Sequence, residues 1–152
     1  METDLSKITL RPFKLEDADD FLLFAGDDQF TGNLRWKTMA SKQEALDHIK
    51  DVCDEDKYKA NFGFGVAVRH WGHGIATKAT KLAVSQFFLD FPQVVRLEAF
   101  VDVDNLASQR VVEKAGFQKE GLLRKYAFLK GKLRDFVLYS FFSSDFPDGC
   151  HS

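Results

Sequence analysis

The sequence predicts a single α/β domain in which a sheet is flanked by helices. Three stretches carry this prediction: an apolar run at 62–68 that leads through a glycine-containing loop into a helical pattern, an alternating strand at 96–103, and a hairpin pattern over 117–142. With 152 residues the chain is long enough for one domain with a core and short for two. We expect that domain to cover residues 1–145, with a polar tail at 146–152.

The first sixty residues predict one strand and two helices. Alternation of apolar and polar residues from Ile8 to Phe13 predicts the strand. An apolar face after residue 16 predicts a helix that Gly26 ends. Ser41 and Glu44 have the spacing of a capping box, which predicts a second helix to about residue 52.

The second half predicts a strand, two helices and a hairpin. A helix follows the glycine loop and ends near Pro92, because the residue before a proline disfavours helical angles. A short helix over 105–114 is closed by Gly116. The last two strands meet at the turn Lys130-Gly131-Lys132.

Composition excludes several classes of protein. A formal net charge of -2 argues against a nucleic-acid partner, since phosphate binding needs clustered cationic side chains. The two cysteines, Cys53 and Cys150, are too few for a disulfide framework and lack the spacing of a zinc site, so we expect no metal. The first ten residues lack the apolar core of a signal peptide, and we find no apolar run of about 18 residues. We therefore expect no membrane partner and a cytoplasmic or nuclear location.

Charge is distributed unevenly along the chain. Acidic residues crowd the first thirty positions, and basic residues crowd positions 114–134. The acidic part would favour a cationic amine and the basic part a ligand with several phosphates. The alternative is that both runs are solvated helix or hairpin faces, which is the commoner role of such charge runs.

The loop Arg69-His70-Trp71-Gly72-His73-Gly74 is the most informative segment of the chain. It lies between a predicted strand and a predicted helix, where the unpaired N–H groups and the positive end of the helix dipole favour an anion. Glycine permits the backbone angles and the close approach that such a cradle needs. The alternative is a turn that uses glycine for its geometry alone.

A second motif follows about thirty residues later. Asn105 and Ser108 open a helix, and Glu113-Lys114-Ala115-Gly116-Phe117 closes it. Arg-x-x-Gly-x-Gly followed by Asn-x-x-Ser resembles the GNAT superfamily of acetyl-CoA-dependent N-acetyltransferases, most of all the branch of the ribosomal-protein N-terminal acetyltransferases. The resemblance covers Ile8 to Phe142. It implies a mixed, mostly antiparallel sheet flanked by helices.

The chain departs from this family between the second helix and the strand before the glycine loop. The family places two antiparallel strands there, whereas here only about seven residues, Asp54 to Ala60, separate the two elements. Seven residues cannot form two strands of ordinary length with their turns. We therefore predict a truncated sheet, whose first strand pairs with residues 61–68 or leaves an exposed edge.

The resemblance implies a site for acetyl-CoA as co-substrate. The loop would bind the diphosphate, the strand before it would pair with the pantetheine arm, and the helix at 105–114 would provide further contacts. The residues implied in cofactor binding are Val66, Val68, Arg69, Gly72, His73, Gly74, Ile75, Ala76, Asn105 and Ser108.

Two residues are candidates for proton transfer. Ser108 matches the position proposed in the ribosomal-protein branch to protonate the departing thiolate, and its alternative role is a helix cap. The tyrosine that many other members use corresponds here to Val112. Glu98, on the strand at 96–103, is the candidate general base, and its alternative role is a surface pair with Arg96.

These residues predict an acetyltransferase that moves an acetyl group from the thioester to a primary amine by direct attack. The acceptor would bind between the first two helices and the last hairpin, and a protein N-terminus, a polyamine and a small amine all stay open. A degenerate acyl-CoA-binding or regulatory module without catalysis is the alternative. The oligomeric state, monomer or homodimer, also stays open.

Overall fold

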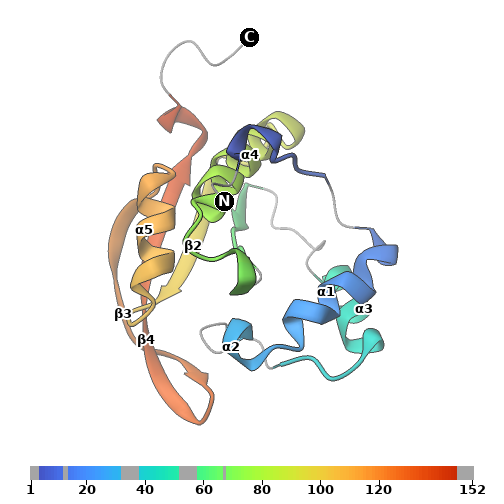
Figure 1. The fold of residues 1–152 in the computed structure, drawn as a ribbon. Helices are drawn as coiled ribbons and strands as arrows, with labels where there is room; N and C mark the ends of the chain where they lie inside the picture. The colour runs from blue at the N-terminus through green and yellow to red at the C-terminus, as the bar shows by residue number, and fades with distance from the viewer. Residues whose placement is uncertain (1–3, 12–13, 32–37, 52–57, 67, 147–152) are drawn as a thin grey trace.

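The protein is described from a computed structural model that covers residues 4–11, 14–31, 38–51, 58–66 and 68–146 (Figure 1). Among these residues the α-helices are α1 (Ala18–Ala25), α2 (Asp28–Thr31), α3 (Lys42–Asp51), α4 (Ile75–Asp90) and α5 (Leu106–Lys114). The strands are β1 (Lys59–Asn61), β2 (Arg96–Asp102), β3 (Gln118–Leu129) and β4 (Lys132–Phe142). Short 3-10 turns lie at Leu5–Lys7, Leu15–Asp17, Val68–His70 and Ser143–Asp145.

The four strands form one sheet in the order β1-β2-β4-β3. β1 runs parallel to β2, whereas β2 and β3 both run antiparallel to β4. The mixed, mostly antiparallel sheet flanked by helices is thereby confirmed, and so is the final hairpin.

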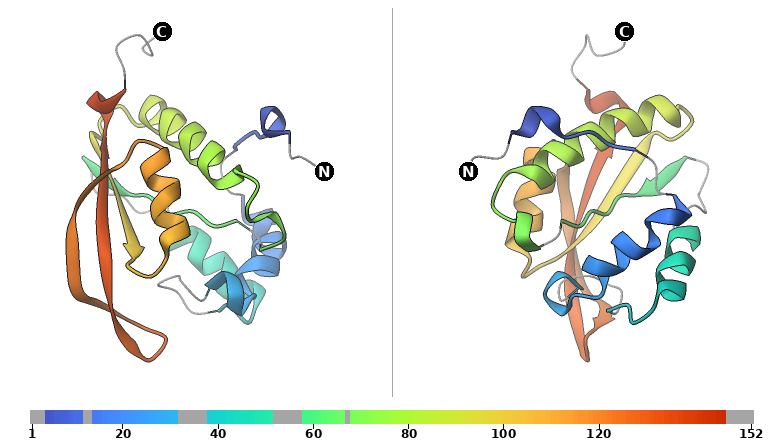
Figure 2. Two further views of the ribbon diagram at one scale, coloured as in Figure 1. Left: turned by 60° about the vertical axis from the view of Figure 1, so that its left-hand side comes forward. Right: turned by 45° about the vertical axis from the view of Figure 1, so that its right-hand side comes forward.

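The main core lies between the sheet and helices α4 and α5, which cover the same face of it (Figure 2). Alternate residues of β2 point into this core, as the period-2 pattern predicts. Its members come from both helices, β2, β4 and the connection from α5 to β3: Val84, Leu97, Ala99, Val101, Val112, Ala115, Phe117, Val137, Tyr139 and Phe141.

Helices α1 and α3 form a second, smaller core with Met39. The predicted start of α3 at Ser41 is confirmed, because Ser41 Oγ accepts from the Glu44 N–H at 3.3 Å. The reciprocal bond of a capping box is shifted by one residue, since Glu44 Oε2 accepts from the Ala40 N–H at 3.1 Å and not from Ser41. Helix α2 was not predicted from the sequence. In Figure 2 the segment 62–66 passes between α4 and the group of α1, α2 and α3.

The predicted first strand is wrong for residues 8–11, which form neither strand nor helix. Residues 12 and 13 lie outside the described part. A strand needs a neighbour with free main-chain groups, and β1, which is only three residues long, pairs with β2 alone among the described strands. The pairing of residues 8–13 with 61–68 that we considered is therefore not formed by residues 8–11.

The predicted strand at 62–68 is also wrong in its bounds. β1 ends at Asn61, and the last contact with β2 is the bond from the Phe62 N–H to the Glu98 carbonyl, at 2.7 Å. Residues 63–66 then leave β2, while β2 continues beside β4 to Asp102. The two segments therefore separate after Phe62.

Candidate functional site

The glycine loop and the start of α5 lie beyond the carboxyl ends of two parallel strands. β1 leads through residues 62–66 into the loop before α4, and β2 leads through residues 103–105 into α5. Parallel strands bring their carboxyl ends to the same edge of a sheet, where ligands of α/β proteins bind. The topology therefore brings the two sequence motifs to one edge.

The glycine loop has the geometry of an open main-chain cradle. Gly72 and Gly74 have φ angles of +76° and +75°, which side-chain-bearing residues rarely adopt. Gly74 is the N-cap of α4, and a Cβ at Gly72 would meet no atom within 4 Å. No described residue accepts a hydrogen bond from the N–H groups of residues 72–77. These donors, at the positive end of α4, are open to an anion.

Two side chains fix the loop locally. The Trp71 indole N–H donates to the Val66 carbonyl at 2.7 Å, which ties the loop to the segment before it. Arg69 Nε donates to His70 Nε2 at 3.0 Å, and both residues are exposed, as is His73. Arg69 therefore stands at the start of the loop without a carboxylate partner among the described residues.

The segment that leaves β2 keeps free main-chain groups. Among the described residues, none accepts from the N–H groups of residues 63–66 or of Val68. Phe30, from α2, lies against this segment so closely that a Cβ at Gly65 would come within 2.1 Å of its ring. The segment thus has a ring of α2 on it and unpaired donors at its edge.

The start of α5 gives Asn105 and Ser108 different tasks. Asn105 is the N-cap, and its Oδ1 accepts from the Ser108 N–H at 3.1 Å. The Ser108 hydroxyl itself bonds to no described residue, so the capping role that we left open for Ser108 belongs to Asn105. Val112 is fully buried in the core.

Glu98 lies in an ion-pair network on the sheet face opposite α4 and α5. Its Oε1 accepts from Arg96 Nε at 2.8 Å, so the pair that we named as its alternative role is present. Arg96 also binds both oxygens of Glu120, at 2.8 and 2.7 Å, and Ser140 Oγ donates to Glu120 at 2.6 Å. The Arg96 guanidinium, assisted by Ser140, lowers the pKa of Glu120 to about 2.

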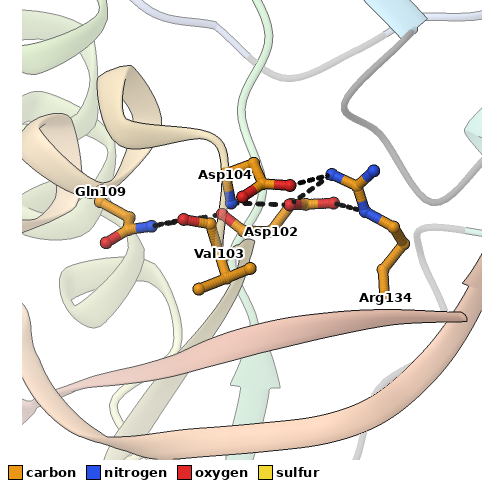
Figure 3. Close-up of polar contacts among 5 residues, drawn as sticks. All are labelled: Asp102, Val103, Asp104, Gln109 and Arg134. Carbon is orange, nitrogen blue, oxygen red and sulfur yellow. Dashed lines mark hydrogen bonds and ion pairs between the residues drawn. The ribbon is translucent and has the colours of Figure 1, made fainter.

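A second network of ion pairs and hydrogen bonds, which was not predicted from the sequence, lies at the carboxyl end of β2 (Figure 3). The Asp102 side chain has an exposed fraction of 0% and forms an ion pair with Arg134 at 2.9 Å. Arg134 also contacts Asp104, at 2.9 Å. Thirty-two positions separate Asp102 from Arg134, so no local pattern joins them. The alternation along β2 places Asp102 on the polar face with Arg96 and Glu98, so nothing in the local sequence indicated that its side chain is buried.

The acidic residues near the N-terminus are largely engaged within the protein. Asp17 binds Arg11 through both carboxylate oxygens, and the guanidinium lowers the pKa of Asp17. Asp19 pairs with Lys42 at 2.6 Å. Asp27 accepts from the Gln29 N–H at 2.8 Å. This part of the chain therefore offers less free negative charge than its composition indicates.

Within the described ranges no three His, Cys, Asp or Glu side chains are grouped so as to hold a metal ion. No described helix has the length and apolar character needed to cross a bilayer. Cys53 and Cys150 lie outside the described residues.

Comparison with known proteins gives the same family for sequence and fold. Residues 51–118 match the acetyltransferase (GNAT) domain. The uncharacterized N-acetyltransferase p20 of Bacillus licheniformis is 25% identical, with 92% of this chain and 95% of p20 aligned. The fold is similar to that of a spermidine N-acetyltransferase from Vibrio cholerae, solved with CoA and spermine, with a TM-score of 0.78. The two chains are 17% identical, and the superposition covers 92% of this chain and 98% of the V. cholerae chain. RimJ from Mycobacterium smegmatis, solved with CoA-disulfide, has a TM-score of 0.77 at 22% identity, over 92% of this chain and 84% of RimJ.

The alignment with p20 is longer than the aligned part of this chain. It runs over 170 positions but takes in only 92% of the 152 residues here, which is about 140 residues. About 30 positions of the alignment therefore have no counterpart in this chain. Two strands of about five or six residues with their turns need fewer positions than this total.

Proposed function

Because the chain belongs to the GNAT acetyltransferases, we propose that its glycine loop binds the diphosphate of acetyl-CoA and that the acetyl group passes to a primary amine. The family makes the chain an N-acetyltransferase with acetyl-CoA as co-substrate. The roles of individual residues and the choice of amine are our proposals. The observation that carries them is the row of N–H groups at residues 72–77, at the start of α4, from which no described residue accepts a hydrogen bond.

The loop fits a diphosphate in shape and charge. Gly72 leaves open space where a side chain would stand, and the N–H groups from Gly72 to Ala76 lie at the positive end of a helix of 16 residues. Arg69 adds a cation that no described carboxylate neutralises. His73, exposed between the two glycines, would contact the same phosphates.

The segment before the loop would hold the pantetheine arm and polarise the thioester. Its free N–H groups, including those of Val66 and Val68, form an edge to which a peptide-like chain can add. A main-chain N–H aimed at the thioester oxygen would stabilise the negative charge that develops there during attack. The Val66 carbonyl already accepts from Trp71, so the free group at Val66 is its N–H.

The start of α5 would assist the departing sulfur. Amine attack on the thioester carbon forms the C–N bond, and rupture of the C–S bond leaves a thiolate that takes up a proton. Ser108 has a hydroxyl without a described partner, in the first turn of α5, and we assign it the donation of that proton. Asn105 uses its oxygen as a cap, which leaves its side-chain NH2 for the pantetheine.

Glu98 is the proposed general base, and its geometry sets a condition on that role. One carboxylate oxygen accepts from Arg96, so only the other is available to take the proton of the amine, directly or through a water. A Glu98→Gln variant should lower kcat about 100- to 10,000-fold if this role is right. The acetyl-CoA affinity should stay unchanged.

We favour a protein or peptide N-terminus over a polyamine as acceptor. A polyamine carries several positive charges and needs several free carboxylates, whereas Asp17 and Asp19 near the proposed acceptor side already bind Arg11 and Lys42. A terminal amine carries one charge. The V. cholerae relative acts on spermidine, so the polyamine is the second acceptor to test.

The second candidate is an acyl-CoA-binding module without catalysis. It is supported by the roughly 30 positions of the p20 alignment that have no counterpart in this chain. β1 has only three residues, and residues 8–11 pair with no described strand. A sheet that lacks strands could bind the co-substrate yet fail to align the amine with the thioester. Holding the amine and the thioester in the right geometry can contribute about 7 kcal/mol or more to lowering the barrier, so a small displacement of either group would abolish transfer.

Calorimetric titration with acetyl-CoA, followed by turnover on spermidine and on peptides with free N-termini, separates these candidates. An active enzyme binds acetyl-CoA and releases CoA only when an acceptor is present, and the acetylated product is identified by its mass. Binding without turnover on either acceptor class favours the non-catalytic module. A folded protein that does not bind acetyl-CoA contradicts both candidates.

A further inference from the structure

The turn between β2 and α5 is held from three directions. Asp102 Oδ2 accepts from Arg134 Nε at 2.9 Å, and its Oδ1 accepts from Arg134 Nη2 at 2.9 Å. The same Oδ1 accepts from the Asp104 N–H at 2.8 Å (Figure 3). Because the Asp102 side chain is fully buried, these donors are what compensate its charge.

Main-chain groups of the turn are bonded to α5 as well. Gln109 Nε2 donates to the Val103 carbonyl at 2.8 Å and to the Asp102 carbonyl at 3.3 Å. The Asn105 N–H donates to the Asp102 carbonyl at 2.9 Å. Asn105 then caps α5 at the N–H of Ser108. A continuous set of bonds thus runs from Arg134 on β4 to the first turn of α5.

We propose that Asp102 and Arg134 are positioning residues for acetyl transfer, which hold the first turn of α5 so that the Ser108 hydroxyl meets the departing sulfur. This inference rests on the proposed role of Ser108. Neither side chain touches the reacting atoms. They act through the 102–105 turn and the Asn105 cap.

A buried ion pair is weak evidence for a stabilising role. Removing two charges from water costs several kcal/mol per ion, and apolar residues in the same place often give equal or greater stability. What this pair does provide is a fixed orientation of the Asp102 side chain. Arg134 binds both oxygens of Asp102 in a planar, bidentate geometry, which fixes the Asp102 side chain relative to β4.

Variants of Asp102 and Ser108 should share a pattern of changes in kcat and acetyl-CoA affinity. If the pair acts by placing Ser108, Ser108→Ala should lower kcat about 100- to 10,000-fold, and Asp102→Asn should lower it up to the same extent. Asp102→Asn should leave acetyl-CoA affinity within about 3-fold. The double variant should then be no slower than the slower single variant, because the misplaced hydroxyl is already lost. Asp104→Asn is the matched control, since Asp104 binds the same arginine from a side chain that is 74% exposed.

The test is a double-mutant cycle of Asp102→Asn with Ser108→Ala, measured as kcat with acetyl-CoA in excess. A second cycle pairs Asp102→Asn with Arg69→Gln, which lies at the diphosphate end and should give additive effects. If Asp102→Asn does not fold at the assay temperature, as shown by circular dichroism, Arg134→Lys replaces it. That variant keeps the charge and loses the bidentate contact, and we expect a smaller loss of kcat.

Additive effects of Asp102 and Ser108, or a loss of affinity as large as the loss of kcat, would overturn the inference and leave the proposed function intact. An unchanged kcat in Ser108→Ala would overturn the role of Ser108 and this inference with it. A wild-type protein that binds acetyl-CoA without turnover contradicts the acetyltransferase assignment itself, and a positioning role for transfer then falls as well.

Discussion

The two halves of the proposed site differ in how far the chain satisfies its own polar groups. In the turn before α5, both oxygens of Asp102 and the carbonyls of Asp102 and Val103 have partners from within the protein. In the loop before α4, the N–H groups of residues 72–77 have none among the described residues. The turn before α5 is therefore ordered by bonds within the protein, whereas the N–H groups of the loop before α4 are available to a ligand.

Burial accounts for this difference. A buried carboxylate without partners would cost several kcal/mol, so Asp102 needs donors from within the protein, and Arg134 provides two of them. The loop is exposed, and water satisfies its N–H groups until an anion replaces that water. We infer that changes in the turn should affect the rate of transfer, whereas changes in the loop should affect affinity.

The largest effect on affinity is expected from Gly72→Val. A β-branched residue at a φ of +76° is strained, and a left-handed conformation costs about 1–2 kcal/mol. The new side chain would also stand in the open space above the N–H groups. We expect acetyl-CoA to bind at least about 10-fold more weakly, since 1.4 kcal/mol is a factor of ten. Calorimetric titration measures this change.

Gly131→Val is the matched control for Gly72→Val. Gly131 has a φ of +80° in the turn between β3 and β4, and a Cβ there also meets no atom within 4 Å. Backbone strain is therefore similar, but the position lies in the other half of the molecule. Equal losses of affinity in the two variants would mean that strain alone, and not the cradle, weakens binding.

How much of this site the sequence predicts depends on how local its signals are. The glycine loop, the start of a helix near Asn105 and the hairpin turn at Gly131 were predicted because each depends on residues within a few positions of one another. The fold class followed from the order of these elements. The start of α4 at Ile75, directly after Gly74, followed from the same pattern.

Predictions that depended on distant partners were less successful. The strand at 8–13 was predicted from alternation, but a strand also needs a neighbour, and residues 8–11 pair with none of the strands in the described part of the chain. The segment 62–66 has a strand-like sequence and leaves the sheet after Phe62. The pair of Asp102 and Arg134 joins two strands that only the folded sheet brings together.

A smaller effect on affinity is expected from Trp71→Phe. The variant keeps an aromatic ring and removes the N–H that ties the loop to the Val66 carbonyl. Loss of one hydrogen bond costs about 0.5–1.5 kcal/mol, so we expect acetyl-CoA to bind about 3- to 10-fold more weakly, with kcat nearly unchanged. Binding that becomes tighter would show instead that the indole competes with the ligand for this carbonyl.

The smallest expected effect is on the free energy of unfolding. It comes from Glu120 on β3, whose ion pair with Arg96 is formed within the sheet and depends on pH. Glu120 has its pKa lowered to about 2 by the Arg96 guanidinium and the Ser140 hydroxyl, from an ordinary value of 4.5. A lowered pKa means that the folded state favours the carboxylate. Its contribution is therefore complete above about pH 4.5 and is lost as the pH falls toward 2.

Glu120→Gln should thus destabilise the protein at pH 7 and have almost no effect near pH 2. Because the Glu120 side chain is 35% exposed, solvent screening limits the loss at pH 7 to about 1 kcal/mol. Urea unfolding of wild type and variant at pH 7, 4 and 3 measures the difference, which should shrink at each step. Glu16→Gln, whose carboxylate bonds to no described residue, should give no such trend. A difference between wild type and Glu120→Gln that stays constant with pH would show that Arg96 does not stabilise this carboxylate in solution.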